Sequence, residues 1–203
     1  MSDHVLMCEP THYRIAYEIN PWMSRGRAVR IDEARAQWAG LHDVLVRLGA
    51  RVELVAPGED VPDMVFTANA GIVIGRRFVV SNFRFAERQP EAVRFERWFA
   101  ERGYEVVRLP DDLRWEGEGD VLAGGDRVFA AHGFRTDASA LDAVEAVLGE
   151  PLLRLELVDP RFYHLDTCLF PVAPGLAACV PVAFSGGSVK CLVLTLEGFE
   201  AHA

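Results

Sequence analysis

Apolar and polar positions along the chain alternate with two different periods, and the changes between them outline the elements. Residues 31–48 carry apolar side chains at helical spacing, and Gly49 follows as a helix stop. Shorter β-rich apolar runs lie on either side of Gly75, a residue suited to a tight turn. The first half of the chain is therefore predicted to contain a helix over 31–48, a strand over 51–55, a hairpin over 64–81, a helix over 90–102 and a strand over 104–109.

The same order of elements returns in the second half of the chain. The second copy comprises a hairpin over 120–132, a helix over 137–149 and a strand over 151–157. Asp137 is the expected helix cap. A third hairpin, over 166–184, follows, but the next helix and strand are missing after Phe184. Such β-β-α-β units, roughly 50 to 60 residues each, bury their apolar faces only by stacking or by closing a ring. We therefore expect a single α/β domain over residues 1–203.

The two ends of the chain bear on how such a ring would close. Residues 4–8, HVLMC, are strand-like but lack a complete hairpin, and residues 185–188 form a Gly-rich turn before an apolar run. We expect that run, over 189–196, to be a strand that pairs with the N-terminal one. This pairing would bring Cys191 to the centre of the ring, beside the starts of the other hairpins.

The composition is that of an ordinary soluble globular protein, with 50% apolar and 25% charged residues among 203. The net charge of -9 and the absence of a Lys/Arg cluster argue against nucleic acids and anionic membranes as partners, and a cationic substrate fits better. The N-terminus has no leader pattern, and no run approaches the roughly 18 apolar residues of a membrane span. We expect a cytoplasmic protein, and nothing in the sequence settles its oligomeric state.

Cysteine and histidine supply the first candidates for chemistry. The four cysteines include no C-x-x-C pair, so neither a disulfide framework nor a zinc ribbon is predicted. Cys191 follows a Gly-rich turn that lets a ligand approach the backbone, and Lys190 beside it favours the thiolate; a buried, inert cysteine is the alternative. His164 and Asp166 share one face of a predicted strand, where an imidazole can move protons while a carboxylate holds a cation. The alternative is a surface pair that opens the strand.

Carboxylates gather at the start of another hairpin, in the segment EGEGD. Glu116, Glu118 and Asp120 lie at what should be a buried edge, where they need a cation or a proton to offset their desolvation. A metal held by these residues and His164 is conceivable, but the spacing matches no standard ligand pattern.

A further polar pair belongs to the first hairpin. Asp63 and Asn69 are expected at opposite ends of one strand, either as site residues or simply as a cap and a turn residue. Because every polar cluster begins or ends a repeat strand, we expect the clusters to converge at one end of the ring and to form the site.

Taken in order, these segments resemble a known family. The motifs are INPWM at 19–23, PDMVFTANAG at 62–71, EGEGD at 116–120, RTD at 135–137, HLDTC at 164–168 and GGSVKC at 186–191. They are similar to those of the guanidino-group modifying superfamily of arginine deiminases, dimethylargininases and amidinotransferases. The resemblance implies a pentein-like α/β propeller of five ββαβ modules, of which this chain lacks about one.

The resemblance also implies roles for the residues singled out above. Cys191 would attack the guanidinium carbon and expel an amine, and water would then resolve the covalent thiouronium intermediate. His164 would protonate the leaving amine and activate the water. Asp63 and Asp166 would hold the guanidinium, in a small-molecule, arginine-like substrate. No cofactor and no metal are implied.

The remaining site residues follow from the same resemblance. Glu118 and Asp120 would orient His164 and Glu116 would contact substrate, although the extra residue in EGEGD allows the two glutamates to exchange roles. Arg135 would pair with the substrate α-carboxylate through its planar fork, with Arg88 as a second candidate.

Residues 66–71, FTANAG, make the chain more similar to the arginine dihydrolase branch, which removes the guanidino group down to ornithine, carbon dioxide and ammonia. Asn69 there could hold a ureido-like intermediate without requiring a positive charge. Dimethylarginine hydrolysis and amidino transfer remain alternatives from the same chemistry. An inactive, shortened propeller that serves as a binding module is a third, because the segment apparently missing between Phe184 and Ser185 corresponds to the end of one module and most of the next.

Overall fold

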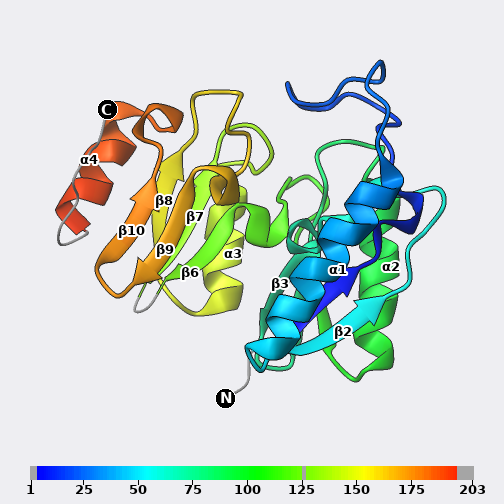
Figure 1. The fold of residues 1–203 in the computed structure, drawn as a ribbon. Coiled ribbons are helices and arrows are strands. Elements are labelled where there is room, and N and C mark those ends of the chain that lie inside the picture. The colour runs from blue at the N-terminus through cyan, green and yellow to red at the C-terminus, as the bar shows by residue number, and fades with distance from the viewer. Residues whose placement is uncertain (1–3, 125–126, 196–203) are drawn as a thin grey trace.

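The computed structural model describes residues 4–124 and 127–195. These residues form four small sheets, and helices lie against them (Figure 1). The first half contains β1 (His4–Cys8), α1 (Ile31–Arg47), β2 (Arg51–Val55), β3 (Gly71–Ile74), β4 (Arg77–Val80), α2 (Gln89–Glu101) and β5 (Glu105–Arg108). The second half contains β6 (Val121–Gly124), β7 (Arg127–His132), α3 (Ala140–Leu148), β8 (Leu152–Glu156), β9 (Leu169–Ala173), β10 (Leu176–Cys179) and α4 (Gly186–Thr195).

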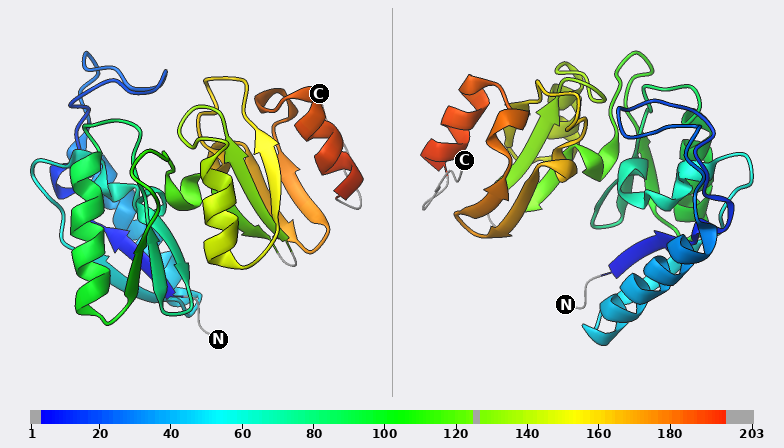
Figure 2. Two further views of the ribbon diagram at one scale, coloured as in Figure 1. Left: turned by 180° about the vertical axis from the view of Figure 1, so that it is seen from behind. Right: turned by 45° about the horizontal axis from the view of Figure 1, so that its top comes forward.

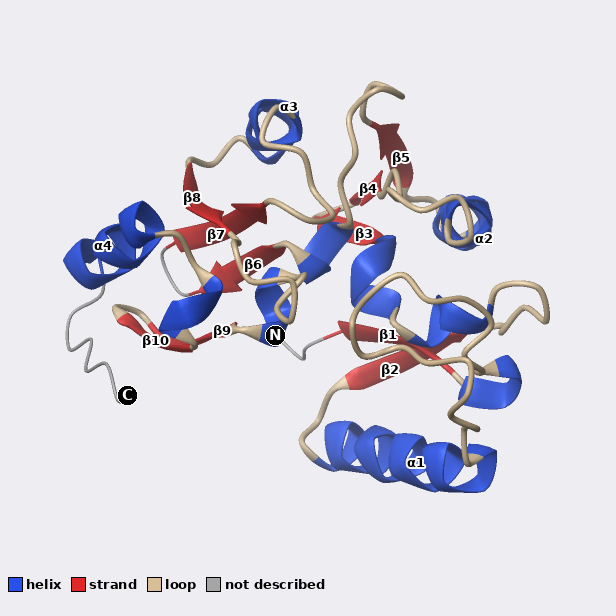
Figure 3. Ribbon diagram, turned by 90° about the horizontal axis from the view of Figure 1, so that it is seen from above, coloured by secondary structure: helices blue, strands red, loops and turns tan. Residues whose placement is uncertain are grey.

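Two complete copies of the predicted β-β-α-β unit are present. In each copy an antiparallel hairpin is followed by a helix and by a strand parallel to the second strand of the hairpin, which gives the sheets β3-β4-β5 and β6-β7-β8. From above, the sheets follow an arc, and helices α1, α2 and α3 lie on its outer side (Figure 3). The repeat inferred from the sequence is therefore confirmed, and the chain has a mixed α/β architecture.

Packing between helix and sheet is uneven along the arc. Helix α2 buries a stripe of apolar side chains, and the ring of Phe99 stacks on that of Phe78 in β4 with centroids 3.9 Å apart. Helix α1 is present as predicted, yet none of its side chains is buried, and Leu48 just beyond its end is 80% exposed. The apolar periodicity of residues 31–48 thus predicted the helix correctly, but the apolar face of this helix is not buried against the described part of the chain.

The third copy of the unit ends differently from the prediction. Residues 186–195 form helix α4 rather than a strand, and α4 packs against β8 with Leu192 fully buried (Figure 2). The Ser188 hydroxyl also accepts a hydrogen bond from the Glu156 amide of β8. Helix α4 therefore follows β9 and β10 in the order expected for the helix of a third copy, and its Leu192 joins a buried cluster with Leu155 of β8 and Leu169 of β9.

Three further expectations about the local structure are wrong. In the described residues β1 pairs with β2 alone, so no C-terminal strand closes a ring. Residues 62–70 form two short 3-10 turns rather than a strand, so Asp63 and Asn69 do not cap one strand. Asp137 does not cap α3, because its carboxylate accepts a hydrogen bond from the Arg114 amide instead.

No helix in the described ranges has both the length and the apolar character that crossing a lipid bilayer requires.

Candidate functional site

Short 3-10 turns precede the first strand of each hairpin and bring the polar motifs together. The turns are Thr67–Ala70 before β3, Gly117–Gly119 before β6 and Leu165–Thr167 before β9. The middle turn contacts both of the others. Close approach requires glycine in the middle turn, because a Cβ on Gly117 would lie 2.6 Å from the Gly71 nitrogen and 2.8 Å from the Ala68 oxygen. The convergence of the motifs predicted from the repeat is thus seen for most of them.

Six of the ten predicted site residues line one recess of about 370 Å³. They are Asp63, Asn69, Arg88, Arg135, His164 and Asp166. Two more, Glu116 and Asp120, are buried directly behind His164 and contact its imidazole. The volume is in the range of small-molecule sites.

His164 lies between two carboxylates. Its Nδ1 is 3.2 Å from Asp120 Oδ1 and its Nε2 is 3.3 Å from Glu116 Oε2. Burial disfavours the charged imidazole, but Asp120 and Glu116 outweigh it and raise the pKa of His164 to about 9. Asp120 is itself fixed by hydrogen bonds from the Thr136 hydroxyl at 2.6 Å and the Leu165 amide at 3.2 Å. The two carboxylates therefore favour the protonated form of the imidazole.

Glu116 joins this imidazolium to a buried arginine. Arg135 Nη1 donates to Glu116 Oε2 at 3.0 Å, and Nη2 donates to the Ile19 carbonyl at 3.0 Å. Burial would raise the pKa of Glu116, but His164 and Arg135 hold it at about 2. Because both terminal nitrogens of Arg135 already have partners within the protein, an α-carboxylate would have to share these donors.

The other predicted arginine is held in the same way. Arg88 donates to both oxygens of Glu91, at 2.9 and 2.8 Å, and to Asn69 Oδ1 at 2.9 Å. The bond to Arg88 fixes which way the Asn69 amide faces. Its nitrogen lies over Gly119, where an added Cβ would approach it to 2.3 Å.

Asp63 differs from Glu116 and Asp120 because one of its carboxylate oxygens accepts no hydrogen bond. The residue is 3% exposed and its Oδ1 has no hydrogen-bond partner. Burial raises the pKa of Asp63 even though Arg88 opposes the shift. Asp166, also in the recess, has accessible surface, yet the protein around it raises its pKa to about 6. A cation that entered the recess would relieve the desolvation of both side chains.

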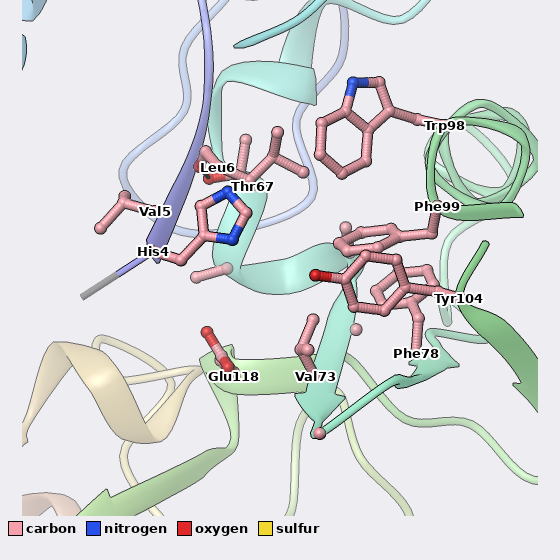
Figure 4. A pocket seen from close by; sticks show the side chains of 14 residues that line it. His4, Val5, Leu6, Thr67, Val73, Phe78, Trp98, Phe99, Tyr104 and Glu118 are labelled. Carbon is pink, nitrogen blue, oxygen red and sulfur yellow. Dashed lines mark hydrogen bonds between the residues drawn. The ribbon is translucent and has the colours of Figure 1, made fainter. Parts of the chain in front are cut away.

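Glu118 and Cys191 are not brought to the recess. Glu118 lines a separate cavity on the other side of the turn Thr67–Ala70 (Figure 4). Cys191 lies on α4, which packs against β8, and not among the residues of the recess. Of the two glutamates in EGEGD, between which the sequence left the choice open, the one beside His164 is Glu116. The placement of Cys191 follows from the helical state of residues 186–195.

The conceivable metal set is also not formed. Among the described residues, no group of three or more His, Cys, Asp or Glu side chains converges as metal ligands do. Glu116 instead lies beside Nε2 of His164, and Asp120 lies beside Nδ1 of the same ring.

The apolar side chains that form one wall of the recess were not among the residues predicted from the sequence. This wall comes from the loop between β1 and α1 and from one aromatic residue before the third turn, and it comprises Tyr13, Ile15, Ile19, Trp22, Met23 and Tyr163. The Trp22 indole donates to the Arg161 carbonyl at 2.8 Å and so ties the loop to the third unit. A long connection with no predicted element and with the motif INPWM was the available signal, since such loops often carry function.

Known proteins are similar to this chain over most of its length, although no family model matches it. It is 45% identical over 179 residues to N(G),N(G)-dimethylarginine dimethylaminohydrolase of Mycobacterium tuberculosis, which covers 88% of this chain and 59% of that protein. It is 41% identical over 196 residues to the bifunctional arginine dihydrolase/ornithine cyclodeaminase ArgZ of Synechocystis, covering 95% of this chain and 28% of that protein. The chain thus spans less than two thirds of these relatives.

Solved structures of the same two groups of enzymes are also similar to this chain. The substrate-bound N-terminal domain of ArgZ, an arginine dihydrolase from cyanobacteria, matches with a TM-score of 0.91 and 40% identity, covering 96% of this chain and 73% of that one. A citrulline complex of the dimethylarginine dimethylaminohydrolase of Pseudomonas aeruginosa matches in fold, with a TM-score of 0.75 and 20% identity. This shorter chain therefore matches the pentein fold of these structures over the part that it covers.

Proposed function

This chain belongs to the superfamily of guanidino-group modifying enzymes, on the side of the arginine dihydrolases, and we propose that its recess binds the guanidino group of arginine or a close relative and hydrolyses the C–N bonds of that group. The observation that carries the proposal is the buried Asp63 carboxylate, one oxygen of which has no partner. A planar guanidinium pairs bidentately with a carboxylate and offsets its desolvation. Asp166 in the same recess supplies a second anionic contact.

His164 provides the proton transfers of this hydrolysis. A thiolate adds to the guanidinium carbon, the C–N bond breaks, and the departing nitrogen takes a proton from the imidazolium and leaves as ammonia. The neutral imidazole then removes a proton from water, which attacks the thiouronium carbon and releases the thiol and a ureido product. Asp120 and Glu116, each about one hydrogen-bond length from the ring, stabilise the imidazolium between these steps.

Cys191 is the thiol proposed for the attack, and it reaches the recess only when the segment 186–195 leaves β8. Two features of that segment support such a move. Its first two residues are glycines, which weaken a helix, and Val189, Leu192 and Val193 suit a strand as well as a helix. Catalysis by this chain therefore includes a change of α4 as an obligatory step.

Asn69 supports the dihydrolase variant of the reaction over a single hydrolysis. After the first C–N bond breaks, the ligand is a neutral ureido group, and an amide can hydrogen-bond it without requiring charge. The Asn69 oxygen is taken by Arg88, so the Nδ2 group is the donor left for the ligand. The expected end products from arginine are ornithine, carbon dioxide and ammonia, with citrulline as an intermediate; dimethylarginine or an amine acceptor would use the same contacts.

A second candidate function is the binding of arginine-type ligands without turnover. The observation in its favour is the position of Cys191 on a helix that packs against β8. In that case the recess keeps its affinity for guanidinium while the thiol stays away from it.

Calorimetric titration with L-arginine, followed by product analysis for ammonia, citrulline and ornithine, separates these possibilities. We expect Asp63→Asn to weaken arginine binding by about tenfold or more, since a charged hydrogen bond is lost. Turnover that disappears in Cys191→Ala, with binding retained, supports the hydrolase; binding without any product in the parent protein supports the second function. A folded protein that binds neither arginine nor dimethylarginine refutes both.

Iodoacetamide labelling tests the movement of α4 directly. If Cys191 enters the recess, arginine should slow its labelling in the parent protein but not in Asp63→Asn. Cys179 provides a matched control, since it is a partly accessible thiol outside the recess.

A further inference from the structure

A second hollow of the molecule lies on the other side of the turn Thr67–Ala70. This cavity of about 460 Å³ is bordered by residues of β1, β3, β4 and α2 and by Tyr104, which directly precedes β5 (Figure 4). Its apolar surface comes from Leu6, Val73, Phe78 and Phe99. The size is in the range of sites for small molecules, and an apolar body with a few fixed polar groups is their usual make-up.

Glu118 is the charged group of this cavity that remains free for a ligand. In the described part of the chain, no hydrogen bond or ion pair engages its carboxylate, whereas the other two carboxylates of EGEGD lie 3.2 and 3.3 Å from the ring nitrogens of His164. The Glu118 side chain keeps access to solvent at the cavity. The protein around it still removes enough water to raise the pKa of Glu118 to about 7. A negative charge in such a place is relieved by a cation.

The other polar groups around the cavity limit further which class of ligand could bind there. The Tyr104 hydroxyl faces the hollow (Figure 4). The guanidinium of Arg76 covers the Tyr104 ring, at 4.2 Å from the ring centre. His4 is already 3.1 Å from Glu53, and the Thr67 hydroxyl already donates to the Leu6 carbonyl at 2.9 Å. A ligand would therefore meet one carboxylate, one phenol and an aromatic wall.

We propose that this cavity binds a small organic cation with an aromatic or aliphatic body, of the arylalkylamine class. The ammonium group donates to Glu118 and to the Tyr104 hydroxyl, and the apolar body packs against Phe78 and Phe99. A carboxylate ligand is disfavoured by Glu118. The site is distinct from the guanidino recess, because Glu118 faces away from His164 while Glu116, two residues earlier, contacts it.

Phenethylamine is a suitable probe, and its binding to the parent chain can be measured by calorimetry at pH 8 alongside the neutral isostere 2-phenylethanol. We expect Glu118→Gln to weaken phenethylamine binding by about tenfold or more and to leave 2-phenylethanol unaffected, since only the charged hydrogen bond is lost. Val73→Trp, which fills the hollow from β3, should abolish the binding of both. Asp63→Asn, in the other recess, should change neither.

Several results would overturn the proposal. They are absence of phenethylamine binding at millimolar concentration, equal affinity for the amine and the alcohol, and full retention of amine binding in Glu118→Gln. Loss of amine binding in Asp63→Asn would place the probe in the guanidino recess instead. Circular dichroism melts of each variant show whether a loss reflects unfolding, and Glu118→Gln, a near-isosteric change at an accessible residue, keeps the test valid if Val73→Trp does not fold.

Discussion

Replacing Glu116 by glutamine removes the charge that joins His164 to Arg135. The Glu116 side chain is fully buried, and the His164 side chain is only 4% exposed, so solvent screens their interaction little. The pKa of His164 rises from 6.5 to about 9 in the fold, which at about 1.4 kcal/mol per pKa unit corresponds to about 3 kcal/mol of preference for the imidazolium. Asp120, the larger contributor, remains in Glu116→Gln. We therefore expect the pKa of His164 to fall by about one unit.

The same substitution should lower the free energy of unfolding by about 3 kcal/mol or more at pH 7. It leaves the buried Arg135 guanidinium without a carboxylate partner, with the neutral amide of the new glutamine, the Ile19 carbonyl and the rings of Phe85 and Tyr163 as neighbours. Breaking one partner of a buried pair typically costs about 3–5 kcal/mol. Urea unfolding gives the free energy, and an NMR titration of the His164 ring protons gives the pKa.

Glu118→Gln is the matched control, because it removes a carboxylate two residues away that faces the other cavity. It should leave the pKa of His164 and the urea midpoint nearly unchanged. If the two variants shift the pKa of His164 equally, or if Glu116→Gln leaves it where it was, the buried network described above does not control the imidazole.

The signs of these pKa shifts fix how stability depends on pH. His164 has a higher pKa in the folded chain, so its contribution is complete below about pH 6.5 and is lost as the pH rises through about 9. The pKa of Glu116 is lowered from 4.5 to about 2, so its contribution is present above about pH 4.5 and is lost as the pH falls through about 2. Urea midpoints from pH 6 to 10 should decline in the parent chain. A flat profile in the parent would contradict the assignment.

The remaining predictions concern packing. Gly119→Ala should abolish arginine binding in a folded protein, because the new Cβ would lie 2.3 Å from Asn69 Nδ2 and 3.0 Å from His164 Nδ1; unaltered affinity in a calorimetric titration would contradict the geometry. Gly40→Ala in α1 meets nothing within 4 Å, so it should stabilise the chain by about 0.5–1 kcal/mol, measured by urea unfolding. Phe95→Ala in α2 removes a fully buried ring and should cost about 3–5 kcal/mol by the same measurement, and a cost below about 1 kcal/mol would mean that α2 is loosely packed.

The sequence by itself determined the elements and their order for most of the chain. Helical spacing and alternating runs are local properties, so the two complete β-β-α-β units appear where residues 64–109 and 120–157 predict them. The repeat also determined which polar motifs would meet, because equivalent turns of stacked units lie at the same end. The motifs in turn indicated the family that the comparisons show.

Tertiary structure decided the conformation of segments that could form either a helix or a strand. It also decided the direction of side chains that could face either of two cavities. Residues 186–195 suit a strand and a helix, and in the fold they form a helix that packs against β8, which takes Cys191 away from the recess. Glu116 and Glu118 are indistinguishable by composition, and the tight Gly117–Gly119 turn directs one toward His164 and the other into the second cavity.

The arginines show the same division. Periodicity and motif identify Arg88 and Arg135 as residues of the site, but not that Glu91 and Glu116 already pair with them. Glu91 lies only three residues after Arg88, at the start of α2, whereas Glu116 reaches Arg135 from a different turn of the fold. Both pairs are buried, and the low dielectric around them makes such pairings strong. The residues of the recess were therefore determined locally, whereas their charges and their freedom to bind a ligand were decided by what packs around them.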